Sequence, residues 1–188
     1  MRWRSSLVIL ALAVSVPACT SGGEDMPECS APDGQVLVLE AQSVPSATRL
    51  PCIAELPAGW RFGGSLIKDT ETTLWLDNDR AGIHALEVTM SASCDTGSAV
   101  QVPPAADEVG MRVFQEPQNL DPYTGSRYLV FDGGCITHEY TFAQGTEPTL
   151  MIEADLAVST VARRDIVTQV QDSLGLTLCG AEAPPCVG

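Results

Sequence analysis

Apolar and polar residues alternate along much of the middle of this 188-residue chain. Alternation with a period of two is typical of β-strands that bury one face. It predicts a strand at 84–90, while runs rich in aromatic and β-branched residues predict strands at 60–68 and 72–77, and further strands are expected at 35–41 and 111–116. In the strand at 84–90, His84 shares the apolar phase with Leu86 and Val88. Prolines at 45 and 51 predict a break after the first strand.

The clearest local prediction is a β-hairpin. Segments 127–131 and 135–142 flank the tripeptide Asp132-Gly133-Gly134, in which glycine can adopt the left-handed conformations of a tight turn. His138 falls in the apolar phase of the second strand, as His84 does in its own.

The last third of the chain changes to the helical period. Segment 163–174 carries an apolar stripe and is followed by Gly175, a typical residue after a helix end. Segment 148–154 is predicted to begin a helix, 155–161 fits a helix or a strand, and 176–178 is expected to form a final strand. Strands followed by one or two helices predict a single α+β domain over 34–188. It would be a mostly antiparallel sheet with one or two helices packed on one face.

The first residues predict export. Arg2 and Arg4 precede an apolar stretch at 7–16, which is too short to span a bilayer as a helix. A short basic region followed by such a stretch is typical of a secretory signal peptide.

The tetrapeptide Val16-Pro17-Ala18-Cys19 closes that stretch and resembles the lipobox of bacterial lipoproteins. The resemblance implies that residues 1–18 are removed and that the Cys19 thiol receives a diacylglycerol. Residues 19–33, rich in Gly, Ser and acidic residues, would then be a flexible tether. The expected location is extracytoplasmic, with the lipid anchor in the cell membrane. The alternative is an ordinary cleaved signal in which Cys19 is incidental.

Charge and cysteine content narrow the picture. The net charge is −14, and loss of Arg2 and Arg4 would make it more negative, which argues against a nucleic-acid partner. Besides Cys19 there are six cysteines, and an even number in an exported chain predicts disulfides. Six cysteines allow fifteen pairings, of which we favour Cys29–Cys52, Cys94–Cys135 and Cys179–Cys186. No cysteine or histidine spacing indicates a zinc site.

Few residues suggest chemistry. The stretch DNDRAG at 77–82 is typical of a hairpin turn, with a calcium site at Asp77 and Asp79 as the alternative, although Ala81 and Val88 do not fit an EF-hand loop. His84 and His138 could together hold a metal or act as a base, whereas partly buried structural histidines are the favoured interpretation. We therefore predict no catalytic residue and no cofactor.

Three segments carry a wider resemblance: LPAGW at 56–60, LWLDNDRAGIHALEVT at 74–89 and YLVFDGGCITHEYTF at 128–142. They resemble segments of uncharacterised exported proteins of actinobacteria, and LPAGW is also similar to a segment of Mog1/PsbP-like lipoproteins, which are α/β sandwiches. The resemblance implies no activity. The function we expect is a lipid-anchored binding or envelope-accessory domain for a protein or small-molecule ligand. A small cell-wall hydrolase and a structural subunit of a membrane complex are the alternatives.

Overall fold

A computed structural model describes residues 26–31, 34–120 and 122–186. Cys19, the lipobox-like tetrapeptide and the predicted signal peptide lie outside these residues. The described elements are α1 (Gln35–Ser43), β1 (Arg49–Ile53), β2 (Trp60–Lys68), β3 (Glu71–Asn78), β4 (Gly82–Ser91), β5 (Val100–Val102), β6 (Arg112–Gln115), β7 (Asn119–Leu120), β8 (Tyr123–Phe131), β9 (Gly134–Thr141), α2 (Leu150–Ala157), β10 (Val158–Ala162) and α3 (Arg163–Leu174).

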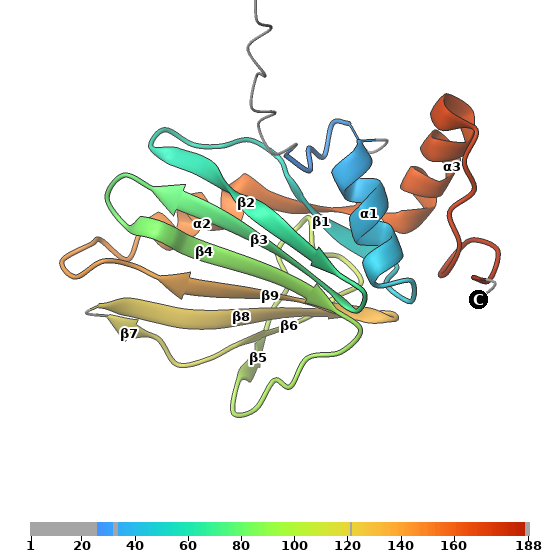
Figure 1. Cartoon of the computed structure of the whole chain (residues 1–188). Helices are drawn as coiled ribbons and strands as arrows, with labels where there is room; N and C mark the ends of the chain where they lie inside the picture. Colours follow the sequence, from blue (N-terminus) through green and yellow to red (C-terminus); the bar gives the residue numbers. More distant parts are fainter. Residues whose placement is uncertain (1–25, 32–33, 121, 187–188) are drawn as a thin grey trace, which may run out of the picture.

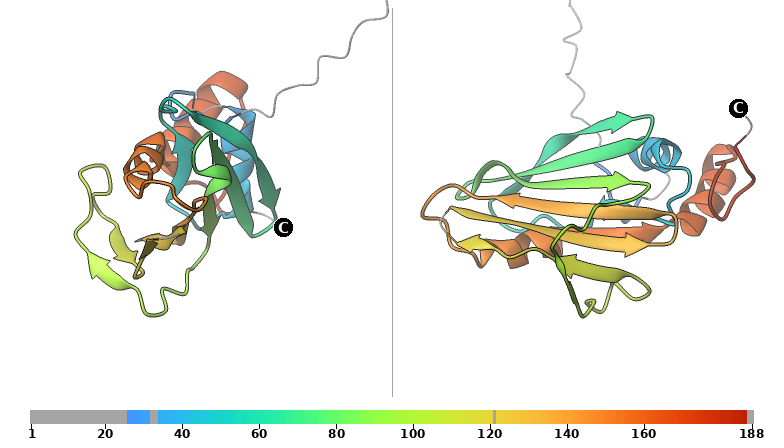
Figure 2. Two further views of the ribbon diagram at one scale, coloured as in Figure 1. Left: turned by 90° about the vertical axis from the view of Figure 1, so that its left-hand side faces the viewer. Right: turned by 90° about the horizontal axis from the view of Figure 1, so that it is seen from below.

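The predicted α+β fold is confirmed (Figure 1). One antiparallel sheet has the strand order β2-β3-β4-β9-β8-β6-β5, with β7 paired to β8, and β1 forms a separate two-stranded ribbon with β10. The large sheet curves, and α2 and the β1–β10 ribbon lie on its inner side (Figure 2). The buried apolar core lies partly between them and includes residues of α1 and α3. No helix among the described residues is long and apolar enough to cross a membrane.

The predicted hairpin is present as β8 and β9. Gly133 has a φ of 73° in its turn, and a Cβ atom there would lie 1.8 Å from the carbonyl oxygen of Ser46. Both the conformation and the close approach require glycine. The Ser46 hydroxyl donates a 2.6 Å hydrogen bond to the Gly133 carbonyl, so the segment after α1 is held against the hairpin.

The C-terminal prediction is confirmed in part. Helix α3 has the predicted bounds and ends at Gly175 in the left-handed conformation, with φ 64°. Helix α2 begins near the predicted start, and the ambiguous segment 155–161 is divided between the end of α2 and β10. The expected strand at 176–178 is wrong, since no strand is assigned there.

The strand expected at 35–41 is also wrong, because this segment forms α1. It is apolar on both phases of a strand, so its hydrophobic pattern does not specify a strand. The helix buries Leu37 and Ala41, four residues apart, beside β1, β2 and β3, while Leu39 stays exposed. Tertiary packing here overrides a local pattern.

Strand β1 was not expected because of Pro51. It forms because β10 is the only strand that pairs with β1, and a single bridge from Ile53 to Glu28 lies on its other edge, so the absent N–H of proline can face away from the ladder. Strand β5 is likewise not among the strands predicted from the sequence.

Three disulfides fasten the domain: Cys29–Cys52, Cys94–Cys135 and Cys179–Cys186, with Cα–Cα distances of 5.0, 5.7 and 4.7 Å. These are the pairs favoured from the sequence. Cys94–Cys135 ties the segment after β4 to the start of β9, which are neighbouring strands. Three disulfides indicate an oxidising environment outside the cytoplasm.

Candidate functional site

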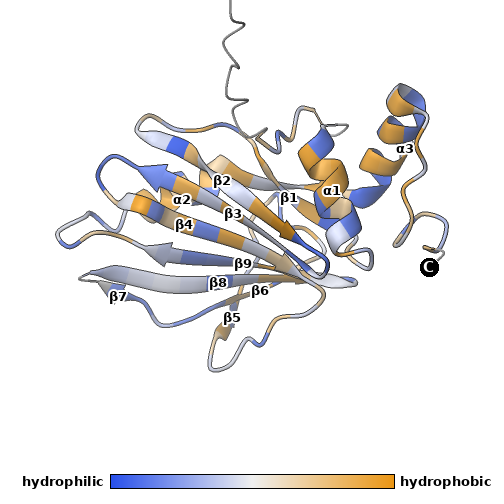
Figure 3. Ribbon diagram, viewed as in Figure 1, coloured by the Kyte–Doolittle hydropathy of each residue, from blue (hydrophilic) through white to orange (hydrophobic). Residues whose placement is uncertain are grey.

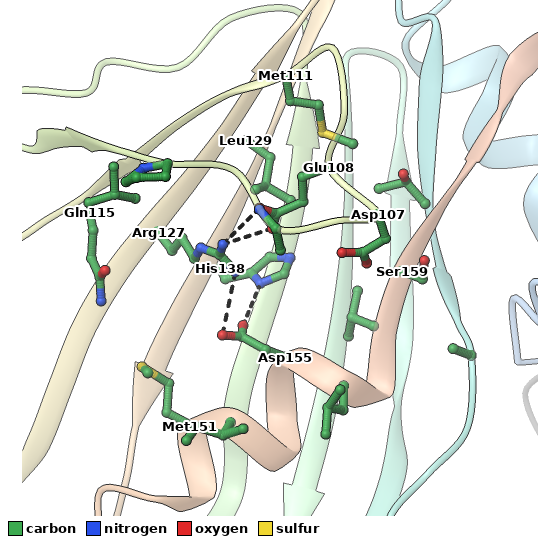
Figure 4. Close-up of a pocket in the computed structure, with 18 residues that line it drawn as sticks. Asp107, Glu108, Met111, Gln115, Arg127, Leu129, His138, Met151, Asp155 and Ser159 are labelled. Carbon is green, nitrogen blue, oxygen red and sulfur yellow. Dashed lines mark hydrogen bonds and ion pairs between the residues drawn. The ribbon is translucent and has the colours of Figure 1, made fainter.

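A cavity of about 580 Å³ lies between α2 and the inner face of the large sheet. Strands β6, β8 and β9 form its floor, α2 and β10 form one wall, and the loop before β6 forms the other (Figure 4). A cavity of this size is in the range that takes small-molecule ligands. Figure 3 shows that β8 and β9, beneath the cavity, are coloured mostly from white to hydrophilic.

Pairing of β8 with β9 builds the floor of the site. Arg127 stands directly opposite His138 in the ladder, so both side chains project from the same face of the sheet. His138 and Tyr140 alternate with exposed residues on β9, and both are buried. The polar groups of the floor thus occupy positions that a half-buried strand usually gives to apolar side chains.

Arg127 makes a buried ion pair with Glu108. Its Nη2 lies 2.8 Å from Oε1 and 2.9 Å from Oε2 of that carboxylate, and the two side chains are 15% and 8% exposed. Glu108 is fixed by its own loop, because Oε2 also accepts a 2.7 Å hydrogen bond from the N–H of Ala105. A charge pair this buried is tolerated only with such additional hydrogen bonds.

Asp155, in the last turn of α2, joins helix and sheet. Its Oδ2 lies 3.4 Å from Arg127 Nη1, and its Oδ1 lies 3.4 Å from His138 Nδ1 and accepts a hydrogen bond from the Tyr140 hydroxyl. Burial alone raises the pKa of Asp155, yet the hydrogen bond and charge of His138, with Tyr140 and Arg127, lower it overall. Burial, and then the charge of Asp155, raise the pKa of Tyr140 well above its ordinary value, which keeps its hydroxyl a donor.

His138 has one occupied and one open ring nitrogen. Nδ1 faces Asp155, whereas Nε2 is buried and has no hydrogen-bond partner among the described residues. The side chain is 4% exposed and lines the cavity. A buried polar atom without a partner costs free energy, so in native structures it usually indicates a bound molecule or water.

The remaining walls are largely apolar. Met111, Leu129 and Met151 line the cavity together with Ile152 and Leu156 of α2. The last two side chains are 57% and 69% exposed, although they belong to a helix packed on the domain. An apolar enclosure with a few convergent polar groups is the usual form of a ligand site.

The candidate calcium residues form a turn instead. Asp77 accepts a 2.8 Å hydrogen bond from the N–H of His84 and lies 3.8 Å from Arg61, which also pairs with Asp79. Within the described ranges no group of three or more potential metal ligands is present. The predicted hairpin turn is thus present between β3 and β4.

The two histidines are not brought together, and the predicted phase of His84 is wrong. A bulge shifts the register between β3 and β4 after Leu76, and His84 has a φ of 52°. Its ring is exposed and stacks on Trp75 at 5.1 Å between centroids. His138 alone of the proposed pair faces the cavity.

The charged network around His138 was not found from the sequence. Glu108, Arg127 and Asp155 come from a loop, a strand and a helix that only the fold brings together. The one usable signal was a histidine in the apolar phase of a strand. Comparison with protein-family models, curated proteins and solved structures finds no match to this chain, so the site's chemistry rests on its own geometry.

Proposed function

We propose that this chain is a lipid-anchored extracytoplasmic protein whose domain binds a small ligand in the cavity beneath α2. The lipobox-like tetrapeptide ending at Cys19 and the disulfides support the location. The observation that carries the binding function is the open, buried Nε2 of His138 inside a cavity of about 580 Å³.

Ligand binding explains features of the cavity that would otherwise only lower the stability of the fold. A core built only for stability would fill this space with apolar side chains rather than with an ion-paired network and an unpartnered nitrogen. Ile152 and Leu156 also remain exposed at the wall of the cavity, where a ligand would cover them.

The test uses N-phenyl-1-naphthylamine, a neutral apolar probe that fluoresces when it leaves water. We expect saturable binding to the purified protein at one site per chain. Leu156→Asp places a charge on the cavity wall and should weaken binding about tenfold, because the probe would have to desolvate that charge. Leu39→Asp is the matched control, since Leu39 is an exposed helical leucine outside the cavity. Absence of saturable binding, or equal loss in both variants, would overturn the proposal.

A small cell-wall hydrolase is the second candidate, supported by the Asp155–His138 pair. A carboxylate that orients an imidazole toward a cavity is the arrangement of a general base. No described side chain bonds Nε2, so His138 would have to act on water or on a hydroxyl of the substrate. Release of soluble fragments from peptidoglycan, abolished in His138→Phe, would favour the hydrolase over a purely binding role.

A further inference from the structure

Whenever the imidazole of His138 is neutral, its open nitrogen is a hydrogen-bond acceptor. Asp155 is held as a carboxylate, which can only accept, so the neutral imidazole carries its proton on Nδ1, the nitrogen 3.4 Å from Asp155. Nε2 then carries a lone pair without a partner among the described residues, on a ring that lies among the side chains lining the cavity (Figure 4). A ligand group satisfies this atom only if it brings an N–H or an O–H.

Arg127 does not offer a matching site for an anion. Its Nη2 contacts both oxygens of Glu108 at 2.8 and 2.9 Å, and its Nη1 lies 3.4 Å from Asp155. The guanidinium is therefore already neutralised by two carboxylates of the protein. A ligand carboxylate would have to compete with both for it.

The charges that line the cavity also disfavour an anionic ligand. They comprise three carboxylates, from Asp107, Glu108 and Asp155, against the single guanidinium of Arg127, while the neutral imidazole of His138 adds no charge. Asp107 is exposed, and in Figure 4 its side chain lies on the side of the cavity toward which the His138 ring points. The cavity thus favours a neutral or cationic head group over an anionic one.

We infer that the cavity selects ligands with an apolar body and a hydrogen-bond-donating head, an alcohol or an ammonium group, and disfavours carboxylates. The head would donate to His138 Nε2, and an ammonium would also lie near Asp107. The body would cover Leu129 and the exposed side chains of Ile152 and Leu156. This inference rests on the proposed binding function and adds the chemical class of the ligand.

Three six-carbon probes that differ in their head group test this inference: hexylammonium, 1-hexanol and hexanoate. Each is used to displace N-phenyl-1-naphthylamine from the purified protein. At about pH 8, because a higher pH favours the neutral form of an imidazole, hexylammonium and hexanol should displace the fluorophore at concentrations about tenfold lower than hexanoate. Equal potency of all three, or the strongest displacement by hexanoate, would overturn the inference while leaving the proposed binding function intact. Failure of the fluorophore itself to bind would overturn the binding function.

Two variants assign the selection to residues. His138→Phe keeps a planar ring and removes the acceptor, so the advantage of hexanol over hexanoate should shrink to about twofold or less. Asp107→Asn changes an exposed residue and does not endanger folding. This variant should bind hexylammonium severalfold more weakly than wild type and should bind hexanol with unchanged affinity. Asp165→Asn, at an exposed carboxylate of α3, is the matched control and should change neither. If Asp107→Asn and Asp165→Asn behave alike, the ammonium part of the inference is wrong even where His138→Phe fails to fold.

Discussion

Arg127 and His138 stand directly opposite each other in the β8–β9 ladder, and both reach the carboxylate of Asp155. One oxygen of that carboxylate lies 3.4 Å from the guanidinium and the other 3.4 Å from the imidazole. A single side chain near the end of α2 thereby anchors the helix to the sheet. It also sets which nitrogen of His138 faces the cavity, so support and recognition depend on the same contact.

Removing that carboxylate should destabilise the fold in a pH-dependent way. The pKa of Asp155 is lowered from 3.8 in the folded state, so its contribution is present above about pH 4 and is lost as the pH falls through the folded value. Asp155→Asn should cost about 3 kcal/mol of unfolding free energy near neutral pH, because it leaves Arg127 and His138 without their shared partner. Urea unfolding at several pH values measures this. The difference in unfolding free energy between wild type and variant should become smaller at acid pH. A difference that does not change with pH would show that Asp155 acts through packing alone.

The carboxyl group of Glu40 should give the opposite pH dependence: it should lower the stability of the fold as the pH rises. It is completely buried in α1, neither oxygen has a hydrogen-bond partner among the described residues, and burial raises its pKa well above 4.5. The folded state therefore holds this proton more tightly, and stability falls as the pH rises above the unfolded value. Glu40→Gln should be nearly neutral at about pH 4 and stabilising near pH 7. Glu40→Met removes the unpartnered oxygens as well and should gain about 1–3 kcal/mol. Destabilisation by both variants near neutral pH would indicate a stabilising partner for the carboxylate.

The parts of the fold that could be predicted are those set by local pattern. Strand β2 and helix α3 have the expected bounds, because the aromatic and β-branched residues of one and the apolar stripe followed by Gly175 of the other are each contained within the segment. The turn at Gly133 was predictable for the same reason. Helix α1 was not, since its leucines and valines suit both periods and its neighbours β1, β2 and β3 decide between them.

The site could be anticipated only through His138. Its position in the apolar phase of a strand was visible, but a strand pattern does not reveal what a buried polar residue contacts. Glu108 and Asp155 lie 30 positions before it and 17 after it, in a loop and a helix. His84 shows the converse failure, because the bulge that turns it outward is a property of the pairing between β3 and β4.

The lipid anchor is a prediction about residues outside the described structure. Because Val16–Cys19 resembles a lipobox, Cys19→Ala should abolish lipid attachment and the associated cleavage. Metabolic labelling with a clickable fatty acid measures the first effect, and the mass of the mature chain measures the second. The variant should partition into the aqueous phase of a detergent extraction. Labelling that persists in Cys19→Ala would contradict the anchor and favour an ordinary cleaved signal.

Of the three disulfides, Cys94–Cys135 closes the longest loop and should contribute most to the free energy of unfolding. It encloses a sequence separation of 41, against 7 for Cys179–Cys186, and it joins the ends of neighbouring strands in the central sheet. In the chain-entropy model the longer loop restricts the unfolded state by about 4 kcal/mol, and the shorter by about 1.5 kcal/mol less. Since domains of this size are typically stable by only about 5–15 kcal/mol, Cys94→Ala/Cys135→Ala should unfold at a much lower temperature than wild type.

Cys179→Ala/Cys186→Ala should lower the unfolding temperature clearly less, because that pair also lies near the chain end. Calorimetry on the two double variants measures the difference. A larger loss from the C-terminal pair would mean that the segment after α3 holds the domain together more than its loop length implies.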